Sequence, residues 1–239
     1  MFKIVTISDT HWRFNEIEVP ECDLLIHAGD ISGKGSKEEV LDFLSWYSKR
    51  PSIYKILIAG NHDFFFERDN KECEDLCKQY GIVYLNDSNV TIEGIKIHGS
   101  PIQPEFCNWA FNRARTKAES KDFGNHLVSH NFIGTHWDLI PDNTDILITH
   151  GPPYDILDQC AHGGKVGCEL LAKKILKIKP KLHIFGHIHE ARGIYIDKDN
   201  GITYNNASSL NLKYKPHPET NFCFDWEKVK TGDSDGRDF

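Results

Sequence analysis

The chain has 239 residues, of which 39% are hydrophobic and 26% are charged, so it can build a full core in one large domain or two small ones. Its formal net charge of −7 disfavours a protein that binds nucleic acid non-specifically through a basic surface. No apolar run approaches the roughly 18 residues that suggest a membrane span, and we expect no membrane partner.

The first residues and the cysteines predict the compartment. Met1–Val5 has the pattern of a strand and not of a signal peptide, because polar residues and Asp9 soon interrupt it. The seven cysteines are an odd number in irregular spacing, which is typical of reduced thiols, so we expect a cytoplasmic protein. Cys73 and Cys77 lie four residues apart on a predicted helix, and packing is favoured there over a zinc site.

Polar side chains follow the first two predicted strands. Phe2–Ile7 is the first strand, and Asp9 and His11 follow it on one loop, where both can reach a single ion. A carboxylate oxygen together with an imidazole nitrogen suits first-row divalent metals. The alternative is that Asp9 caps a helix and His11 is a surface residue. Asp23–His27 is the second strand, and it delivers Asp30 after a glycine.

A helix and a third strand come next. Ser36–Lys49 has one apolar stripe and begins with a capping box, so it predicts a helix. Ser52–Ala59 is an apolar strand that ends abruptly at Gly60–Asp63, where Asn, His and Asp follow the glycine. In open α/β sheets, sites form at this carboxyl edge of the strands.

The middle of the chain predicts a helix, short strands and an aromatic loop. Asn70–Tyr80 is the helix, and three short strands over residues 83–85, 90–92 and 95–98 indicate an antiparallel part of the sheet. In the loop that follows, Trp109 with Asn112 and Arg113 forms a candidate site for stacking a ring, and the alternative is that the aromatic residues simply bury themselves.

The second half repeats the pattern of a strand that ends in histidine. Asp145–Thr149 leads to His150, and Leu182–Phe185 leads to His187 and His189. Helices are predicted over residues 116–137 and 166–178, and β-like segments over 193–197, 202–206 and 221–226, with a hairpin turn at 199–201. Residues 231–239 are polar and predict a disordered tail.

Five strand ends together supply two Asp, one Asn and five His. Seven of these side chains can ligate two ions, and one His is left over. The eight remaining histidines are interpreted as surface or packing residues: His27, His98, His126, His130, His136, His162, His183 and His217.

These motifs resemble those of the calcineurin-like metallophosphoesterase superfamily, all five in order between Asp9 and His189. Within it, the loops at Gly99–Pro104, Trp109–Asn112 and His150–Pro153 are similar to the metallophosphoesterase-domain-containing branch, which is related to class III cyclic nucleotide phosphodiesterases. The resemblance implies an α/β fold, a four-layer α/β/β/α sandwich with two mixed sheets flanked by helices. We expect a single metallophosphoesterase domain over residues 1–230.

The resemblance also implies roles for the seven ligands and for the remaining histidine. Asp9, His11 and His189 would hold one ion, Asn61, His150 and His187 the other, and Asp30 would bridge both. His62 would face the leaving group of the substrate. The ligand set accepts Mn, Fe, Zn or Ni, so two divalent ions are expected without their identity.

The charges of such a site fit phosphoester hydrolysis. Two divalent ions bring four positive charges, and Asp9 and Asp30 cancel two, which suits a phosphoryl group and lowers the pKa of a bridging water to give a hydroxide nucleophile. His62 can protonate the leaving oxygen. Asp63 is a candidate for orienting His62, or it caps the next segment.

We therefore expect a phosphodiesterase that acts on a small nucleotide-like ester, with a cyclic nucleotide as one candidate. The alternatives are a phosphomonoesterase, a nuclease acting on short oligonucleotides, and a non-catalytic scaffold. The acidic balance argues against long duplex nucleic acid. A homodimer is one alternative for the oligomeric state.

Overall fold

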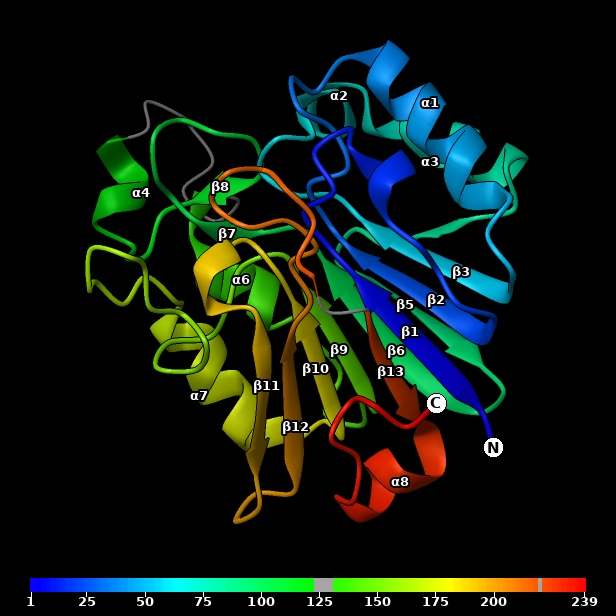
Figure 1. Ribbon diagram of the computed structural model, residues 1–239. Helices are drawn as coiled ribbons and strands as arrows, with labels where there is room; N and C mark the ends of the chain where they lie inside the picture. Colours follow the sequence, from blue (N-terminus) through cyan, green and yellow to red (C-terminus); the bar gives the residue numbers. More distant parts are fainter. Residues whose placement is uncertain (123–130, 219–220) are drawn as a thin grey trace.

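The computed structural model describes residues 1–122, 131–218 and 221–239, which form two stacked β-sheets with helices on their outer faces (Figure 1). The first sheet has the order β13-β1-β2-β3-β4, and β13 alone is antiparallel to its neighbour. Its strands are β13 (Phe222–Asp225), β1 (Lys3–Ile7), β2 (Cys22–Ala28), β3 (Ser52–Ile58) and β4 (Val83–Tyr84).

The second sheet has the order β11-β12-β10-β9-β6-β5, with a parallel centre and an antiparallel strand at each edge. Its strands are β11 (Gly193–Asp197), β12 (Ile202–Asn206), β10 (Leu182–Phe185), β9 (Ile146–Thr149), β6 (Ile95–Ser100) and β5 (Ser88–Ile92). A short parallel pair, β7 (Gln103–Pro104) and β8 (Asn112–Arg113), lies in the loop after β6.

The helices form the two outer layers (Figure 1). The first sheet is covered by α1 (Lys37–Ser48), α2 (Phe64–Arg68) and α3 (Asn70–Gln79), and the second by α6 (Ile133–Trp137) and α7 (Glu169–Ile178). The remaining helical segments are η1 (Phe14–Glu16), α4 (Glu119–Asp122), η2 (His189–Ala191) and α8 (Trp226–Thr231).

The alternation of side chains along each strand explains the four layers. Ile4, Leu24 and Ile184 lie between the two sheets, whereas Val5 and Leu25, one position along, pack under the helices. Each central strand is therefore buried on both faces, as parallel strands usually are. The predicted four-layer α/β/β/α sandwich is confirmed.

Local signals at α1 are also confirmed. The Ser36 side chain accepts a hydrogen bond from the Glu39 backbone, and the Glu39 side chain accepts one from the Ser36 backbone. At the other end of α1, the buried Tyr47 hydroxyl lies 3.0 Å from the Leu25 carbonyl and 2.8 Å from the Ile56 carbonyl, which ties the helix to β2 and β3.

Two segments differ from the predictions. The predicted helix over residues 116–137 contains α4 and α6, and residues 123–130 lie outside the described residues. The predicted disordered tail instead runs beside β13, where Cys223 donates to the Gly236 carbonyl at 2.7 Å and accepts from the Asp238 backbone at 2.9 Å. Because β13 is an edge strand, its free backbone groups need partners, and the tail supplies them.

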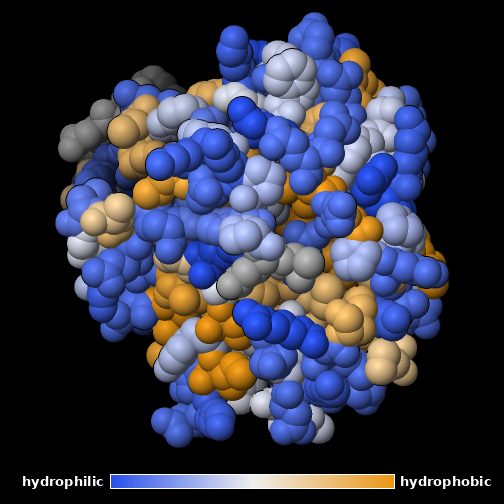
Figure 2. Space-filling view, viewed as in Figure 1, coloured by the Kyte–Doolittle hydropathy of each residue, from blue (hydrophilic) through white to orange (hydrophobic). Residues whose placement is uncertain are grey.

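The visible surface is largely hydrophilic. Figure 2 shows polar residues over most of this face and a hydrophobic area over β11 and β12. No helix in the described ranges combines the length and the hydrophobicity that crossing a bilayer requires.

Candidate metal centre

The carboxyl ends of five parallel strands meet at one end of the sandwich. Asp9 follows β1, Asp30 follows β2 and Asn61 follows β3, and these come from the first sheet. His150 follows β9, and His187 with His189 follows β10 in the second sheet. The centre is therefore shared between the two sheets, and neither sheet alone holds a complete set of ligands.

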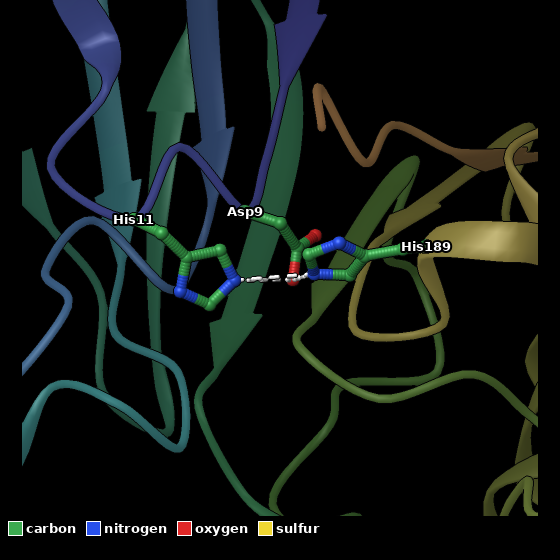
Figure 3. Close-up of side chains that lie close together, drawn as sticks. All are labelled: Asp9, His11 and His189. Atoms are coloured by element: carbon green, nitrogen blue, oxygen red, sulfur yellow. Dashed lines mark hydrogen bonds and ion pairs between the residues drawn. The ribbon is translucent and has the colours of Figure 1, made fainter. Parts of the chain in front are cut away.

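Asp9, His11 and His189 form the first group (Figure 3). The Nε2 atoms of His11 and His189 lie 3.1 Å apart, and His189 Nε2 is 3.5 Å from Asp9 Oδ1. In Figure 3 both imidazoles turn a nitrogen toward the Asp9 carboxylate.

Asp30, His150 and His187 form the second group. His150 Nε2 lies 3.4 Å from Asp30 Oδ2 and 2.9 Å from Asn61 Oδ1, so Asn61 belongs to this group as well. Asp30 Oδ2 is also 3.7 Å from His11 Nε2 of the first group. Asp30 is thus the side chain that lies between the two groups.

The donor atoms fit a pair of divalent ions. Two ligand atoms that each bind one ion at about 2.1 Å lie about 3 to 3.5 Å from one another, close to the separations found in both groups. The ligand nitrogens are also held in the required orientation, because His150 Nδ1 is 2.9 Å from the Ala28 carbonyl and His189 Nδ1 is 3.3 Å from the Asn211 carbonyl. These bonds to Nδ1 leave the Nε2 lone pairs facing the centre.

The electrostatics of the centre favour ionised carboxylates and divide its imidazoles into some whose pKa is lowered and others whose pKa is raised. Burial lowers the pKa of His11 to about 4 and that of His187 to about 3. Burial raises the pKa of Asp30, but the nearby His150 outweighs this and holds that pKa well below its usual range. Burial likewise disfavours the charged form of His150, yet the Asp30 carboxylate raises its pKa to about 9. A site that stabilises a cationic histidine is also one that attracts a metal cation.

The backbone of the centre is strained at the candidate ligands. Asp9, His11, Asp30 and His187 have φ values of 52°, 41°, 57° and 71°, in the left-handed region that residues with a Cβ rarely adopt. Gly186 is required for close packing, because a Cβ there would collide with the Asp9 carboxylate. The loops are thus bent to point these side chains inward.

His62 lies at the edge of the centre and is half-buried. Its Nδ1 is 3.0 Å from the Gly33 carbonyl, and its ring centroid is 4.5 Å from that of His11 and 4.2 Å from that of Trp109. A hydrogen bond from Nδ1 to Gly33 leaves Nε2 free on the other side of the ring. His62 is also within ligand distance of His11 and Asp30, so the distances permit either a ligand or a proton donor.

Asp63 does not contact the His62 ring, which corrects the predicted orienting role. Its Oδ2 accepts backbone hydrogen bonds from Gly60 at 2.8 Å and Asp30 at 3.0 Å, and its Oδ1 accepts from the Ser32 backbone at 3.0 Å and the Ser32 hydroxyl at 2.5 Å. The His62 ring is oriented instead by the Gly33 carbonyl, which lies 3.0 Å from its Nδ1. Asp63 therefore shapes the loop that carries Asp30.

Replacing Asp63 by alanine is expected to destabilise the protein, because several buried N–H groups lose their acceptor. Each buried group left unsatisfied costs about 1–3 kcal/mol, so the free energy of unfolding should fall by roughly 3 kcal/mol or more. Urea denaturation of the wild type, Asp63→Ala and the conservative Asp63→Asn measures this, and Asp63→Asn should lose less. A loss below about 1 kcal/mol in Asp63→Ala would contradict the role.

A cavity of about 250 Å³ opens above the centre. Trp109, one of the three residues predicted to contact substrate, lines it together with Phe106 and Tyr214. Asn112 and Arg113 do not line it, which corrects two of the three predicted substrate residues. The Asn112 amide donates to the Phe106 carbonyl at 2.6 Å, and the Arg113 guanidinium pairs with Glu67 at 3.1 Å, so both hold the loop in shape.

The segment after β12 adds residues that the sequence reasoning missed. The Ser208 hydroxyl donates to Asp9 Oδ2 at 2.9 Å, and Tyr214 lies edge-on to His11 and His189 with centroids 5.0 Å and 5.6 Å apart. A signal was present, because Asn205, Asn206 and Ser208 are polar residues at the end of a predicted strand, as at the other five strand ends.

Several of the remaining histidines have packing roles. His27, His98 and His183 are fully buried, and their ring nitrogens lie near Thr10, Asn89 and Thr149 respectively. His126 and His130 lie outside the described residues. Cys73 and Cys77 are buried in the hydrophobic cluster under α3, in agreement with the predicted packing role.

The fold and the paired ligand groups define the class of metallophosphoesterases. The model of the family described as calcineurin-like phosphoesterase matches residues 2–191, a range that contains every candidate ligand. This chain belongs to the calcineurin-like phosphoesterase family.

Similar proteins support the same assignment. Human metallophosphoesterase domain-containing protein 1 is 39% identical, over 90% of this chain and 68% of its own length. A UPF0046 protein of Caenorhabditis elegans is 35% identical, over 87% of this chain and 70% of its own. Among solved structures, the phosphopantetheinyl hydrolase from Mycobacterium tuberculosis has a similar fold, with a TM-score of 0.60 and 16% identity over 89% of this chain and 90% of its own.

Proposed function

We propose that this protein is a phosphodiesterase that uses two divalent metal ions to hydrolyse a small nucleotide-like ester. The observation that carries the proposal is the pair of ligand groups joined by Asp30, which lies 3.4 Å from His150 of one group and 3.7 Å from His11 of the other. Sites with two metals hold the attacking oxygen and a phosphate oxygen together, which matches the chemistry of this family.

The ligand roles follow the two groups. Asp9, His11 and His189 would hold one ion, and Asn61, His150 and His187 would hold the other, with Asp30 as a ligand available to both. Two bound divalent ions would bring four positive charges, less two from Asp9 and Asp30, and the remaining charge of about plus two would suit a phosphoryl group and lower the pKa of water. Mn, Fe, Zn and Ni are all compatible with these ligands.

The protein's own residues orient the substrate and move a proton. Trp109 forms one wall of the cavity and packs against His62, with ring centroids 4.2 Å apart. The His62 ring is further fixed by its hydrogen bond to the Gly33 carbonyl. Nε2 then faces the leaving oxygen and donates the proton that an alkoxide requires.

Domain organisation and location complete the proposal. Residues 1–230 act as a single domain, because the ligands come from both sheets. A cytoplasmic location is supported by the cysteines, since Cys107 is both exposed and free, which suits a reducing compartment.

Substrate preference provides the test. The kcat/KM for bis-nitrophenyl phosphate should exceed that for nitrophenyl phosphate, because the contacts around the centre favour a diester. Both compounds release nitrophenolate, which needs no proton, so the comparison does not depend on His62. The charge of the centre alone favours the monoester, which carries nearly two negative charges at neutral pH. If the monoester is cleaved far better than every diester, including 2′,3′- and 3′,5′-cyclic nucleotides, the protein is a phosphatase and the diesterase proposal fails.

Trp109→Ala tests the role of Trp109 separately from the reaction class. Loss of the aromatic contact with His62 should lower kcat/KM for diesters by about 2- to 13-fold, since such pairs contribute about 0.5–1.5 kcal/mol. An unchanged kcat/KM would leave the reaction class in place and remove Trp109 from the site.

A further inference from the structure

A second cavity, of about 470 Å³, adjoins the metal centre on the other side of Phe106. Phe106, His187 and Glu190 line both cavities, so the second one lies directly beside the first. The Phe106 ring stands edge-on to the His187 imidazole, with centroids 5.0 Å apart. A substrate whose phosphate lies at His187 can therefore extend past Phe106 into this space.

The walls of this second cavity are largely apolar and held in place. Pro104, Pro152, Val166 and Ile188 supply apolar surface to it. The Arg115 guanidinium donates to the Val166 carbonyl at 2.7 Å and to the Gly167 carbonyl at 2.9 Å, and it pairs with Glu169 at 2.8 Å. The loop at Pro152 and the loop at Val166 are also joined, because the Cys168 backbone N–H donates to the Pro152 carbonyl at 3.0 Å. The cavity is thus preformed, as small-molecule sites usually are.

The two carboxylates at the cavity disfavour a second anionic group. Glu105 and Glu190 both line it and are exposed, and the Arg115 charge is already paired with Glu169. A second phosphate would meet two carboxylates without a free cation from Arg115. Flat surfaces of Phe106, the prolines and the guanidinium instead suit an uncharged planar ring.

We propose that this cavity binds a planar, uncharged ring carried by the ester oxygen of the substrate. This rests on the proposed function, because it places the phosphate at the metal centre. The proposal places the substrate ring in this cavity and not against Trp109. The Trp109 ring already packs against His62 and Phe64, with centroids 4.2 Å and 5.8 Å apart. The substrate class becomes a phosphodiester with one ring-bearing substituent and no second phosphate next to it.

Equilibrium binding tests the proposal without relying on turnover. The probes are benzyl(methyl)phosphinate and dimethylphosphinate, two singly charged anions that have no P–O ester bond to hydrolyse and differ only in the phenyl ring, added to the Mn²⁺-loaded protein in a calorimeter. The benzyl compound, the phenyl probe, should bind about tenfold more tightly or better, because the ring loses apolar surface to water. Val166→Phe fills the cavity from a half-buried position and should reduce this preference to less than about threefold.

Two further variants control for effects on folding and packing. Thr91→Phe adds the same side chain at an exposed position of β5 and should keep the full preference. Val166→Ala adds no bulk to the cavity and should keep most of the preference for the phenyl probe. Equal binding of the two probes by the wild type, or an unchanged preference in Val166→Phe, overturns the proposal.

The outcomes for the cavity and for the reaction are separable. Selective binding of the phenyl probe, lost in Val166→Phe, together with no hydrolysis of any phosphate ester would leave the ring site standing and the phosphodiesterase function refuted. Diester hydrolysis with equal binding of both probes would support the phosphodiesterase function and refute the ring site.

Discussion

Replacing Asp30 by alanine is expected to abolish activity and to reduce bound metal below that of the wild type. Among the described residues, Asp30 is the carboxylate that lies close to ligands of both groups, and its backbone is held at a φ of 57° by the loop that Asp63 shapes. Residues that only support a metal ligand typically cost 10–100-fold when mutated, so loss of a shared ligand should lower kcat/KM by roughly 10³-fold or more.

Metal analysis of the purified variant, joined to diester kinetics, measures both effects. Asp42→Ala is a matched control, because it removes an exposed carboxylate on α1 and should change neither value. Full occupancy by two ions and normal turnover in Asp30→Ala would rule out the assignment of Asp30.

Replacing His62 by alanine is expected to keep both metals and to lose roughly 10²–10⁴ in rate on substrates with a poor leaving group. The loss should shrink for esters of nitrophenol, because nitrophenolate departs without a proton. Within one variant, the ratio of the two losses therefore reports proton donation independently of any general damage to the site.

Metal content distinguishes the two roles that the geometry permits for His62. If His62→Ala loses an ion, the residue is a ligand, in keeping with its proximity to His11 and Asp30. An equal loss of rate on both kinds of substrate would count against the acid role. Retained metal together with a loss that depends on the leaving group supports it.

The sequence predicts the fold and the ligand cluster well because both depend on local patterns. Apolar strands that end abruptly in Asp, Asn or His recur along the chain, and parallel strands bring their carboxyl ends to one edge. The family resemblance, and not a local pattern, implied that Asp30 lies between the two groups, and the structure shows that its strand, β2, is central in its sheet.

The contacts made by loops could not be predicted in the same way. Asn112 and Arg113 have suitable chemistry for a substrate site, but the short β7–β8 pairing places them where they bind the loop itself. Asp63 follows His62 in sequence and yet accepts from the backbone of a different loop. Such outcomes depend on backbone conformations that residue types do not specify.

The chain brings together His11 and His189, whose Nε2 atoms are 3.1 Å apart although 178 residues separate them along the sequence. Contacts over such separations form late and slow the folding of a chain. During synthesis, β1, β2 and β3 leave the ribosome with Asp9, Asp30 and Asn61, but β9 and β10 with their histidines follow more than eighty residues later. Both ligand groups can therefore be completed only after most of the chain has been translated. Metal bound at these groups would then select molecules in which the two sheets have packed correctly, and it would add its own free energy to their stability.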